Sequence, residues 1–234
     1  MWGTMRDFTL LDVCGFGWFA LAWIGYTLYA RSGRRKHRTI SAVMNTFRRQ
    51  WLVEMSRREV RLVDVNALNS LAHNVTFFAS TTILVVGGLF ALLGASDRAI
   101  GALGDLPFAV HTSQSVWEVK VLLLIVLFIY AFFQFAWASR MSNYCAILIG
   151  AAPAVGDPSL PVHAERAARM TNLMGHHFNL GLRAYFFALA FLGWFVHPWA
   201  LILATTWVVA INYWREFRSP EFRALQAGTE SGTG

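Results

Sequence analysis

Residues 40–65 read ISAVMNTFRRQWLVEMSRREVRLVDV, and the prediction for the whole chain starts from this stretch. The stretch is too polar to cross a bilayer, and its apolar side is too extensive for a helix surrounded by water. Its arginines, among them Arg48, Arg49 and Arg57, fall on other faces. We therefore predict a basic amphipathic interfacial helix over about residues 40–72. Its apolar stripe, at helical spacing, is Ile40, Val43, Met44, Phe47, Trp51 and Met55.

One side of this helix combines charge with the apolar stripe. At about 100° per residue, Glu54, Arg58 and Arg61 share a side with Trp51. Glu54 and Arg58 also stand four residues apart, in the favourable order for an ion pair on a helix. We therefore expect this helix to pack on the inner ends of membrane spans, where its charges would meet other polar groups.

The composition is typical of a membrane protein. The 234 residues are 56% hydrophobic and 14% charged, with a mean hydropathy of +0.45, whereas soluble domains carry about 25% charged residues. We predict one all-α domain over residues 1–225, a multipass membrane helical bundle. The net charge of +7 comes with no recognition motif, so no nucleic-acid partner is predicted.

Long apolar runs predict about five transmembrane helices. A break at 156–161, GDPSLP, precedes a short amphipathic helix predicted at 162–175. Gly87 and Gly88 in the second span indicate a packing face or a kink. The polar tail at 226–234 is predicted to be disordered. The predicted spans are 10–30, 74–94, 117–140 with a continuation to about 152, 177–196 and 199–214.

The basic residues are unevenly distributed between the predicted loops. Ten of the 20 Lys and Arg lie between Arg31 and Arg61, whereas only Arg6, Arg98 and Lys120 fall on the other side of the membrane. Since loops rich in Lys and Arg stay in the cytoplasm, we predict a bacterial inner-membrane protein with its N-terminus outside and its C-terminus inside. Lys120, at the outer edge of the third span, is expected to snorkel.

Polar residues of the spans gather near the predicted cytoplasmic face, and intramembrane polar groups are functional candidates because they are costly. Arg183 is the central one, with Glu54 or Glu216 as its expected ion-pair partner. A structural role, in which Arg183 reaches lipid phosphate or Glu216, stays open beside an anion, lipid or proton site. The candidate polar or anion site is Arg183, Asn179, Asn143, Glu54, Arg58 and Glu216, and the candidate lipid-headgroup contacts are Arg48, Arg49, Arg57 and Arg61.

The sequence predicts no metal site, no cofactor and no enzyme. Cys14 and Cys145 form no CxxC pair and fall near opposite membrane faces, so no disulfide between them is expected. Asp12, in the first span, stands alone, and hydrolase and nucleotide-binding motifs are absent. The remaining cofactor alternative is haem held by one histidine, which would be His73, His177 or His197.

Four parts of the chain between Arg48 and Arg223 occur in a recognisable order. They are RRQWLVEMSRREVRLVDVNAL followed by FFASTTILVVGGL, then FAWASRMSNYCAILIGAAP, FNLGLRAYFFALAFLGWFVHPW and YWREFRSPEFR. In this order they resemble a family of uncharacterised bacterial membrane proteins, domain of unknown function 599. The resemblance implies a multipass inner-membrane protein, and it implies no activity and no catalytic residue.

Two functions of different classes follow from these observations. The first is a small oligomeric transport or channel protein with a polar site near the cytoplasmic face, because five spans alone enclose a pore poorly. The second is a non-catalytic structural, lipid-binding or complex-assembly protein, in which the basic helix recognises anionic lipid. The partners predicted on either view are membrane lipids with anionic headgroups, and further copies of the chain or a membrane complex.

Overall fold

The computed structural model describes residues 8–31, 39–104 and 113–226. Every regular element in these ranges is a helix, which confirms the predicted all-α fold. The basic segment at 32–38 and the part of the predicted disordered tail beyond Gln226 lie outside the described residues.

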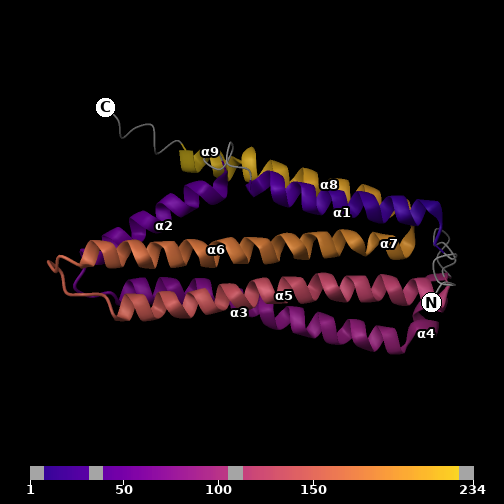
Figure 1. Ribbon diagram of the computed structural model, residues 1–234, viewed down its shortest axis with the longest axis horizontal. Coiled ribbons are helices and arrows are strands. Elements are labelled where there is room, and N and C mark those ends of the chain that lie inside the picture. Colours follow the sequence, from indigo (N-terminus) through magenta and orange to yellow (C-terminus); the bar gives the residue numbers. More distant parts are fainter. Residues whose placement is uncertain (1–7, 32–38, 105–112, 227–234) are drawn as a thin grey trace.

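Three long helices lie side by side at the centre of the molecule (Figure 1). α5 (Gln114–Gly150) packs on both α3 (Leu62–Gly94) and α6 (Leu160–Phe191). At 1.5 Å per residue, the 37 residues of α5 extend about 55 Å. The hydrocarbon core of a bilayer is only about 30 Å thick, so a membrane around these helices would leave part of them projecting into water.

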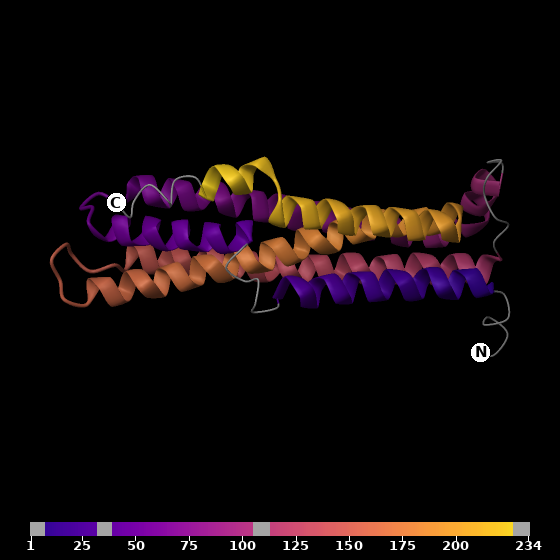
Figure 2. The same ribbon diagram turned by 90° about the horizontal axis from the view of Figure 1, so that it is seen from above.

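A second layer covers one side of α6. α1 (Leu10–Arg31) and α8 (Pro198–Phe217) run side by side in the same direction, and α8 also packs on α6 (Figures 1 and 2). The single turn α7 (Gly193–Val196) joins α6 to α8. α8 begins at a capped turn, in which Nδ1 of His197 accepts a hydrogen bond from the backbone N–H of Trp199 at 3.1 Å.

Shorter helices complete the two ends of the bundle. α2 (Ile40–Ser56) packs along the part of α6 that lies away from α7, and α9 (Pro220–Gln226) contacts α2. Oγ1 of Thr39 caps the start of α2 by accepting the N–H of Ala42 at 3.1 Å. α4 (Ser96–Gly104) lies at the opposite end, near the start of α5 (Figure 1).

The single helix predicted over 40–72 is wrong, because the chain reverses at 57–61. The backbone N–H groups of Arg57 and Arg58 bond to the carbonyls of Glu54 and Met55 at 3.1 Å, which closes the last turn of α2. α3 then begins a second helix that continues without a break through the predicted second span. The helical phase therefore restarts at the turn, and residues on its two sides do not share a helix face.

The predicted division between a helix at 162–175 and a fourth span at 177–196 is also wrong. α6 is continuous over 32 residues, and the chain breaks only after Phe191. Gly175 lies within the helix and does not end it, since glycine weakens a helix by only about 1 kcal/mol relative to alanine. The predicted continuation of the third span to about residue 152 is present, since α5 ends at Gly150.

Four helices of the described chain are long and apolar enough to cross a membrane, judged by length and composition. They are α1, α3, α5, and α6 together with α7. α8, the predicted fifth span, is not among them, although it lies beside α1 over its length (Figure 2).

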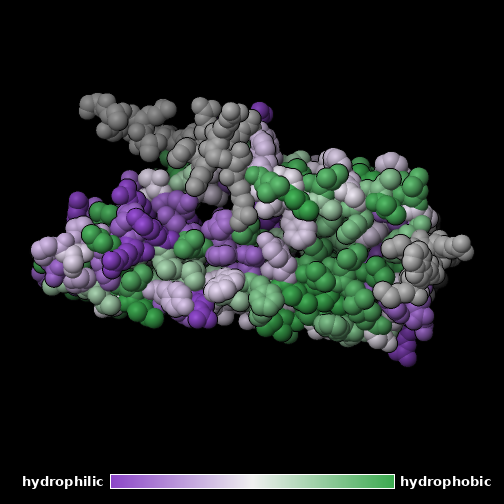
Figure 3. Space-filling view, in the orientation of Figure 1, coloured by the Kyte–Doolittle hydropathy of each residue, from purple (hydrophilic) through white to green (hydrophobic). Residues whose placement is uncertain are grey.

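The molecule has an apolar half and a polar half. In the face that Figure 3 shows, hydrophobic residues gather over the half with α7 and the first part of α8, and hydrophilic residues over the half with α2. Each half has its own core. Phe19, Phe187, Phe191, Trp194 and Leu201 belong to the core of the apolar half, and Leu52, Met55, Leu68, Phe135 and Ala184 to that of the polar half.

Candidate anion site

Two adjoining cavities open where α2 and α6 meet the ends of α1 and α8. Their volumes are about 330 and 560 Å³. Five residues line both cavities, and we call the combined space the two-arginine cavity: Ser41, Arg48, Asn179, Arg183 and Glu216.

Arg48 reaches this cavity because the packed face of α2 carries it there. Leu52 and Met55, one and two turns further along α2, are fully buried, so the face they share with Arg48 points at the bundle. Nη1 of Arg48 donates to Oδ1 of Asn45 at 2.9 Å. Burial lowers the pKa of Arg48. Because a free arginine has a pKa above 12, the side chain still carries its charge at neutral pH.

A glycine on α6 makes room for the Arg48 guanidinium. A Cβ atom added at Gly175 would lie 2.7 Å from the central carbon and from both terminal nitrogens of Arg48. The guanidinium therefore lies flat against the backbone of α6 at this position. An alanine there would push the side chain of Arg48 away, and the flexible arginine has the freedom to move.

Arg183 enters the cavity from α6, about two turns after Gly175. Its guanidinium lies over the ring of Tyr26 on α1, with 4.9 Å between the guanidinium carbon and the ring centroid. Among the described residues, no carboxylate lies within ion-pair distance of either Arg48 or Arg183. Two guanidinium groups without a counterion thus face one space.

Neutral polar groups and two carboxylates complete the lining. Nδ2 of Asn179 lies 3.4 Å from Oγ of Ser41, so these two side chains connect α6 to α2 across the cavity. Glu216, half-buried on the last turn of α8, supplies one negative charge, and the exposed Glu221 lies with the exposed Arg215 at one edge. Guanidinium, amide and hydroxyl donors are the groups that bind phosphate or carboxylate.

The structure brings together three residues of the predicted site: Arg183, Asn179 and Glu216. The expected ion pair between Arg183 and either Glu54 or Glu216 is not found. Glu54 instead bonds to Arg57 on the surface at 2.8 Å. Asn143 is exposed on α5 and does not line the cavity, and Arg58 is at the turn between α2 and α3.

The four arginines expected at lipid headgroups have different surroundings. Arg48 faces the cavity, as described above. Arg49 donates to Glu165 of α6 at 2.7 Å. Arg57 is 70% exposed and bonds only to the neighbouring Glu54. Arg61 donates to the carbonyl oxygens of Ala152 and Pro153 at 2.7 and 2.6 Å, so it joins the start of α3 to the loop after α5.

A buried carboxylate holds the turn between α2 and α3. Oδ1 of Asp64, which has no exposed surface, accepts hydrogen bonds from Nε1 of Trp51 and Nη1 of Arg58, both at 2.7 Å. The predicted pair between Arg58 and Glu54 is therefore replaced by a pair with Asp64. This contact fixes the direction in which α2 leaves the turn, and so the side of α2 that faces α6.

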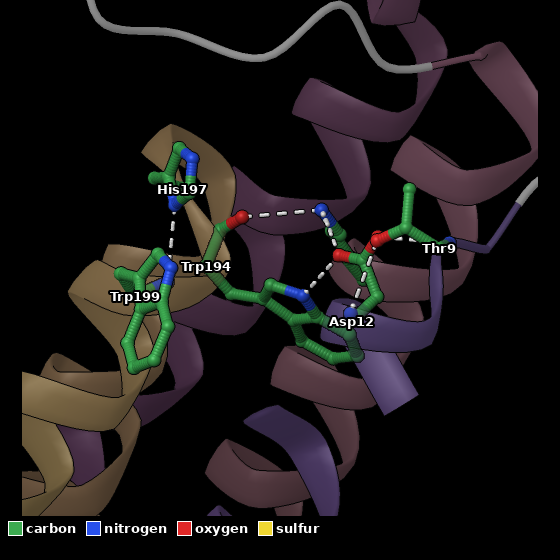
Figure 4. Close-up of polar contacts among 6 residues, drawn as sticks. Thr9, Asp12, Trp194, His197 and Trp199 are labelled. Atoms are coloured by element: carbon green, nitrogen blue, oxygen red, sulfur yellow. Dashed lines mark hydrogen bonds and ion pairs between the residues drawn. The ribbon is translucent and has the colours of Figure 1, made fainter. Parts of the chain in front are cut away.

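A second polar cluster lies in the apolar half, where α1, α5 and α7 meet (Figure 4). Oδ1 of Asp12 accepts the indole N–H of Trp194 at 2.7 Å, and Oδ2 accepts the hydroxyl of Thr9 at 2.6 Å. Nζ of Lys120 lies 3.4 Å from Asp12 and donates to the carbonyl of Trp194 at 3.1 Å.

This cluster corrects two expectations. Lys120 does not snorkel, since it is 4% exposed and its ammonium group is held between Asp12 and Trp194. Asp12 does not stand alone. Because all polar atoms of the cluster are directed at one another, we assign it a structural role, the joining of three helices.

The remaining candidates have local roles. Both cysteines are free thiols, Cys14 exposed and Cys145 buried. Nδ1 of His177 lies 2.9 Å from Oε1 of Gln134, and His197 caps α8. Within the described ranges, no group of three His, Cys, Asp or Glu is placed to hold a metal ion.

The fold and its apolar half define an integral membrane protein of the all-α bundle class. The chain matches the family described as "Protein of unknown function, DUF599" over residues 14–221, and it belongs to this family. Searches among curated proteins and among solved structures gave no match.

Proposed function

We propose that this protein is a non-catalytic membrane protein that binds an anionic ligand in the two-arginine cavity. The observation that carries the proposal is that Arg48 and Arg183 face one space without an ion pair to any described residue. Half-buried cations without partners are costly, and an anion that entered the cavity would supply the missing charge.

Binding is better supported than permeation. Beside the cavity, the core of the apolar half consists of close-packed aromatic side chains, with Phe19, Phe187 and Phe191 at most 2% exposed. These residues offer no polar path along the bundle. Transport of the bound anion, by an oligomer of the chain or together with a membrane partner, is the second candidate, and the unpaired arginines are the observation that favours it. Anion flux into liposomes that is lost in Arg183→Gln would support it.

For the orientation, we propose that the polar half faces the bacterial cytoplasm and that the apolar half spans the inner membrane. Support comes from the ten Lys and Arg between Arg31 and Arg61, which the positive-inside rule assigns to the cytoplasm. α8 would be the fifth span, because it starts and ends beside α1. The N-terminus would then lie outside and the C-terminus inside.

The test is the thermal stability of the detergent-purified protein with and without millimolar inorganic phosphate, at an ionic strength kept equal with chloride. A ligand that binds only the folded state raises Tm. We expect phosphate to raise Tm of the native protein and of Arg57→Gln, the matched surface variant on α2. We expect at least about a tenfold higher phosphate concentration to be needed in Arg48→Gln or Arg183→Gln. An equal response of all four proteins would contradict the proposal.

A further inference from the structure

We infer that the anion bound in the two-arginine cavity is the phosphate diester of a membrane glycerophospholipid. This inference rests on the proposed function and adds the class of ligand. It is carried by the depth of the cavity in the bundle, the pairing of its cations with apolar walls, and the presence of one carboxylate.

The depth follows from α1 and α8. They contain 22 and 20 residues, which at 1.5 Å each gives lengths of about 33 and 30 Å, the thickness of the hydrocarbon core. The two helices are in register. Trp18 and Thr206, each eight residues into its helix, are joined by a hydrogen bond of 3.1 Å, and the ring of Tyr29 lies 5.9 Å from that of Phe217 near both C-terminal ends. Both helices therefore end at one level.

The cavity lies at this level. Tyr26 and Ala30, from the last two turns of α1, and Asn212 and Glu216, from the end of α8, all contribute to its lining. Tyr29 and Tyr213 stack beside it at 6.4 Å, and tyrosines favour the boundary between hydrocarbon and headgroups. A membrane that covers the apolar half thus has its phosphate groups at the height of the cavity.

The walls fit an amphipathic ligand better than a free ion. The guanidinium groups of Arg48 and Arg183 offer paired N–H donors, which match two oxygens of a phosphate. Apolar side chains stand in the same lining: Ile40, Met44, Leu182 and Phe186. A phosphate that carries a glycerol backbone can place that backbone against these side chains, whereas a free phosphate gains nothing from them.

Glu216 restricts the charge and the chemistry of the headgroup. Its carboxylate lines both cavities and repels a second negative charge, which disfavours a dianionic phosphate monoester. It can accept a hydrogen bond from a hydroxyl or an ammonium group. The combination of two arginines and one glutamate therefore suits a singly charged phosphate diester with a donor on its headgroup, as in phosphatidylglycerol.

The test is a titration of the full-length protein, purified in a nonionic detergent, with phosphatidylglycerol by native mass spectrometry. Soluble glycerol 3-phosphate and inorganic phosphate serve as competitors. We expect phosphatidylglycerol to bind at least tenfold more tightly than either soluble anion, and Arg48→Gln and Arg183→Gln each to weaken it at least tenfold. Arg57→Gln should bind like the native protein.

Gly175→Ala tests the geometry without a change of charge. Its Cβ occupies the place of the Arg48 guanidinium, so we expect lipid binding to weaken several-fold while Tm without lipid stays close to that of the native protein. Weakening by Arg57→Gln to the same extent as by Arg183→Gln would overturn the inference, since it would indicate unspecific attraction to the basic surface. Soluble phosphate that binds as tightly as the lipid would overturn it too but leave the proposed function standing. If neither anion binds, both fail.

Discussion

At the residue scale, the closest packing of the bundle occurs where a glycine of α6 meets an aromatic ring of α5. A Cβ atom at Gly181 would lie 2.6 Å from Cε1 of Phe135, and Phe135 is fully buried among neighbours that leave it no free space. The two longest helices of the bundle can approach this closely only because position 181 has no side chain.

We expect Gly181→Ala to destabilise the protein by about 1–3 kcal/mol, the usual cost of overpacking a core. Gly88→Ala is the matched control, because nothing lies within 4 Å of a Cβ at Gly88 and alanine favours a helix. Thermal unfolding in detergent should show a lower Tm for the first variant only. Equal Tm values for both would contradict the packing described for α5 and α6.

Arg48 shows where prediction from the sequence ended. The pattern of 40–65 correctly indicated an amphipathic helix, but the stripe through Phe47 was taken as the packed side. The structure leaves Phe47 38% exposed and buries Leu52 and Met55. The face of Ser41, Met44, Arg48, Leu52 and Met55 has the same helical spacing as the predicted stripe, and it contains an arginine. Hydrophobic periodicity alone ranks such a face second, because a half-buried cation has no place in the pattern.

At the element scale, the direction of α2 depends on the turn at 57–61 and on the carboxylate below it. No property of the local sequence distinguishes this turn from a continuous helix, since it contains neither glycine nor proline. The contacts of Asp64 with Trp51 and Arg58 are made between two helices, so they were not readable from the spacing of either one.

We expect Asp64→Ala to loosen α2 from α3, because it leaves the indole N–H of Trp51 without its acceptor and Arg58 without its counterion. The cost should be about 1–3 kcal/mol, and trypsin should cut faster at the arginines of 57–61. Glu54→Ala is the control, since it removes only the exposed pair with Arg57, which contributes under about 1 kcal/mol. Equal cleavage rates in the two variants would speak against a supporting role for Asp64.

The cluster of Asp12, Lys120 and Trp194 gives a prediction for the opposite end. In Lys120→Met, the carboxylate of Asp12 loses its only close cation, and breaking a buried pair costs about 3–5 kcal/mol. The double variant Asp12→Asn, Lys120→Met contains no buried charge at this place and should recover most of the lost Tm. A double variant that is less stable than Lys120→Met would show that the cluster does not act as an ion pair.

At the scale of the whole molecule, the sequence was sufficient for the fold class and for most helices. The long apolar runs identified α1, α3, α5, α6 and α8, because hydrophobic length is determined by composition. The composition did not show that the central helices extend beyond the apolar half with a core of their own. The polar faces of α3, α5 and α6 in that half had been read as loops and interfaces, since their buried contacts are made with one another.

The proposed topology is tested with single cysteines in a Cys14→Ser, Cys145→Ala background. We expect Asp97→Cys in α4 to react with a membrane-impermeant thiol reagent in intact cells. Val155→Cys, in the loop before α6, and Arg223→Cys in α9 should react only after the membrane is permeabilised. Labelling of Arg223→Cys from outside would show that α8 does not span the membrane.

The central claim is that α2 is docked on α6 with Arg48 turned inward, which creates the two-arginine cavity. The most direct measurement is thiol crosslinking in membranes with a short bifunctional reagent in the same cysteine-free background. Oγ of Ser41 and Nδ2 of Asn179 lie 3.4 Å apart, so Ser41→Cys with Asn179→Cys should crosslink rapidly. Phe47→Cys with Asn179→Cys should not, because Phe47 is on the exposed side of α2. Crosslinking of the Phe47 pair with no crosslinking of the Ser41 pair would mean that α2 turns Arg48 outward, and it would contradict the account.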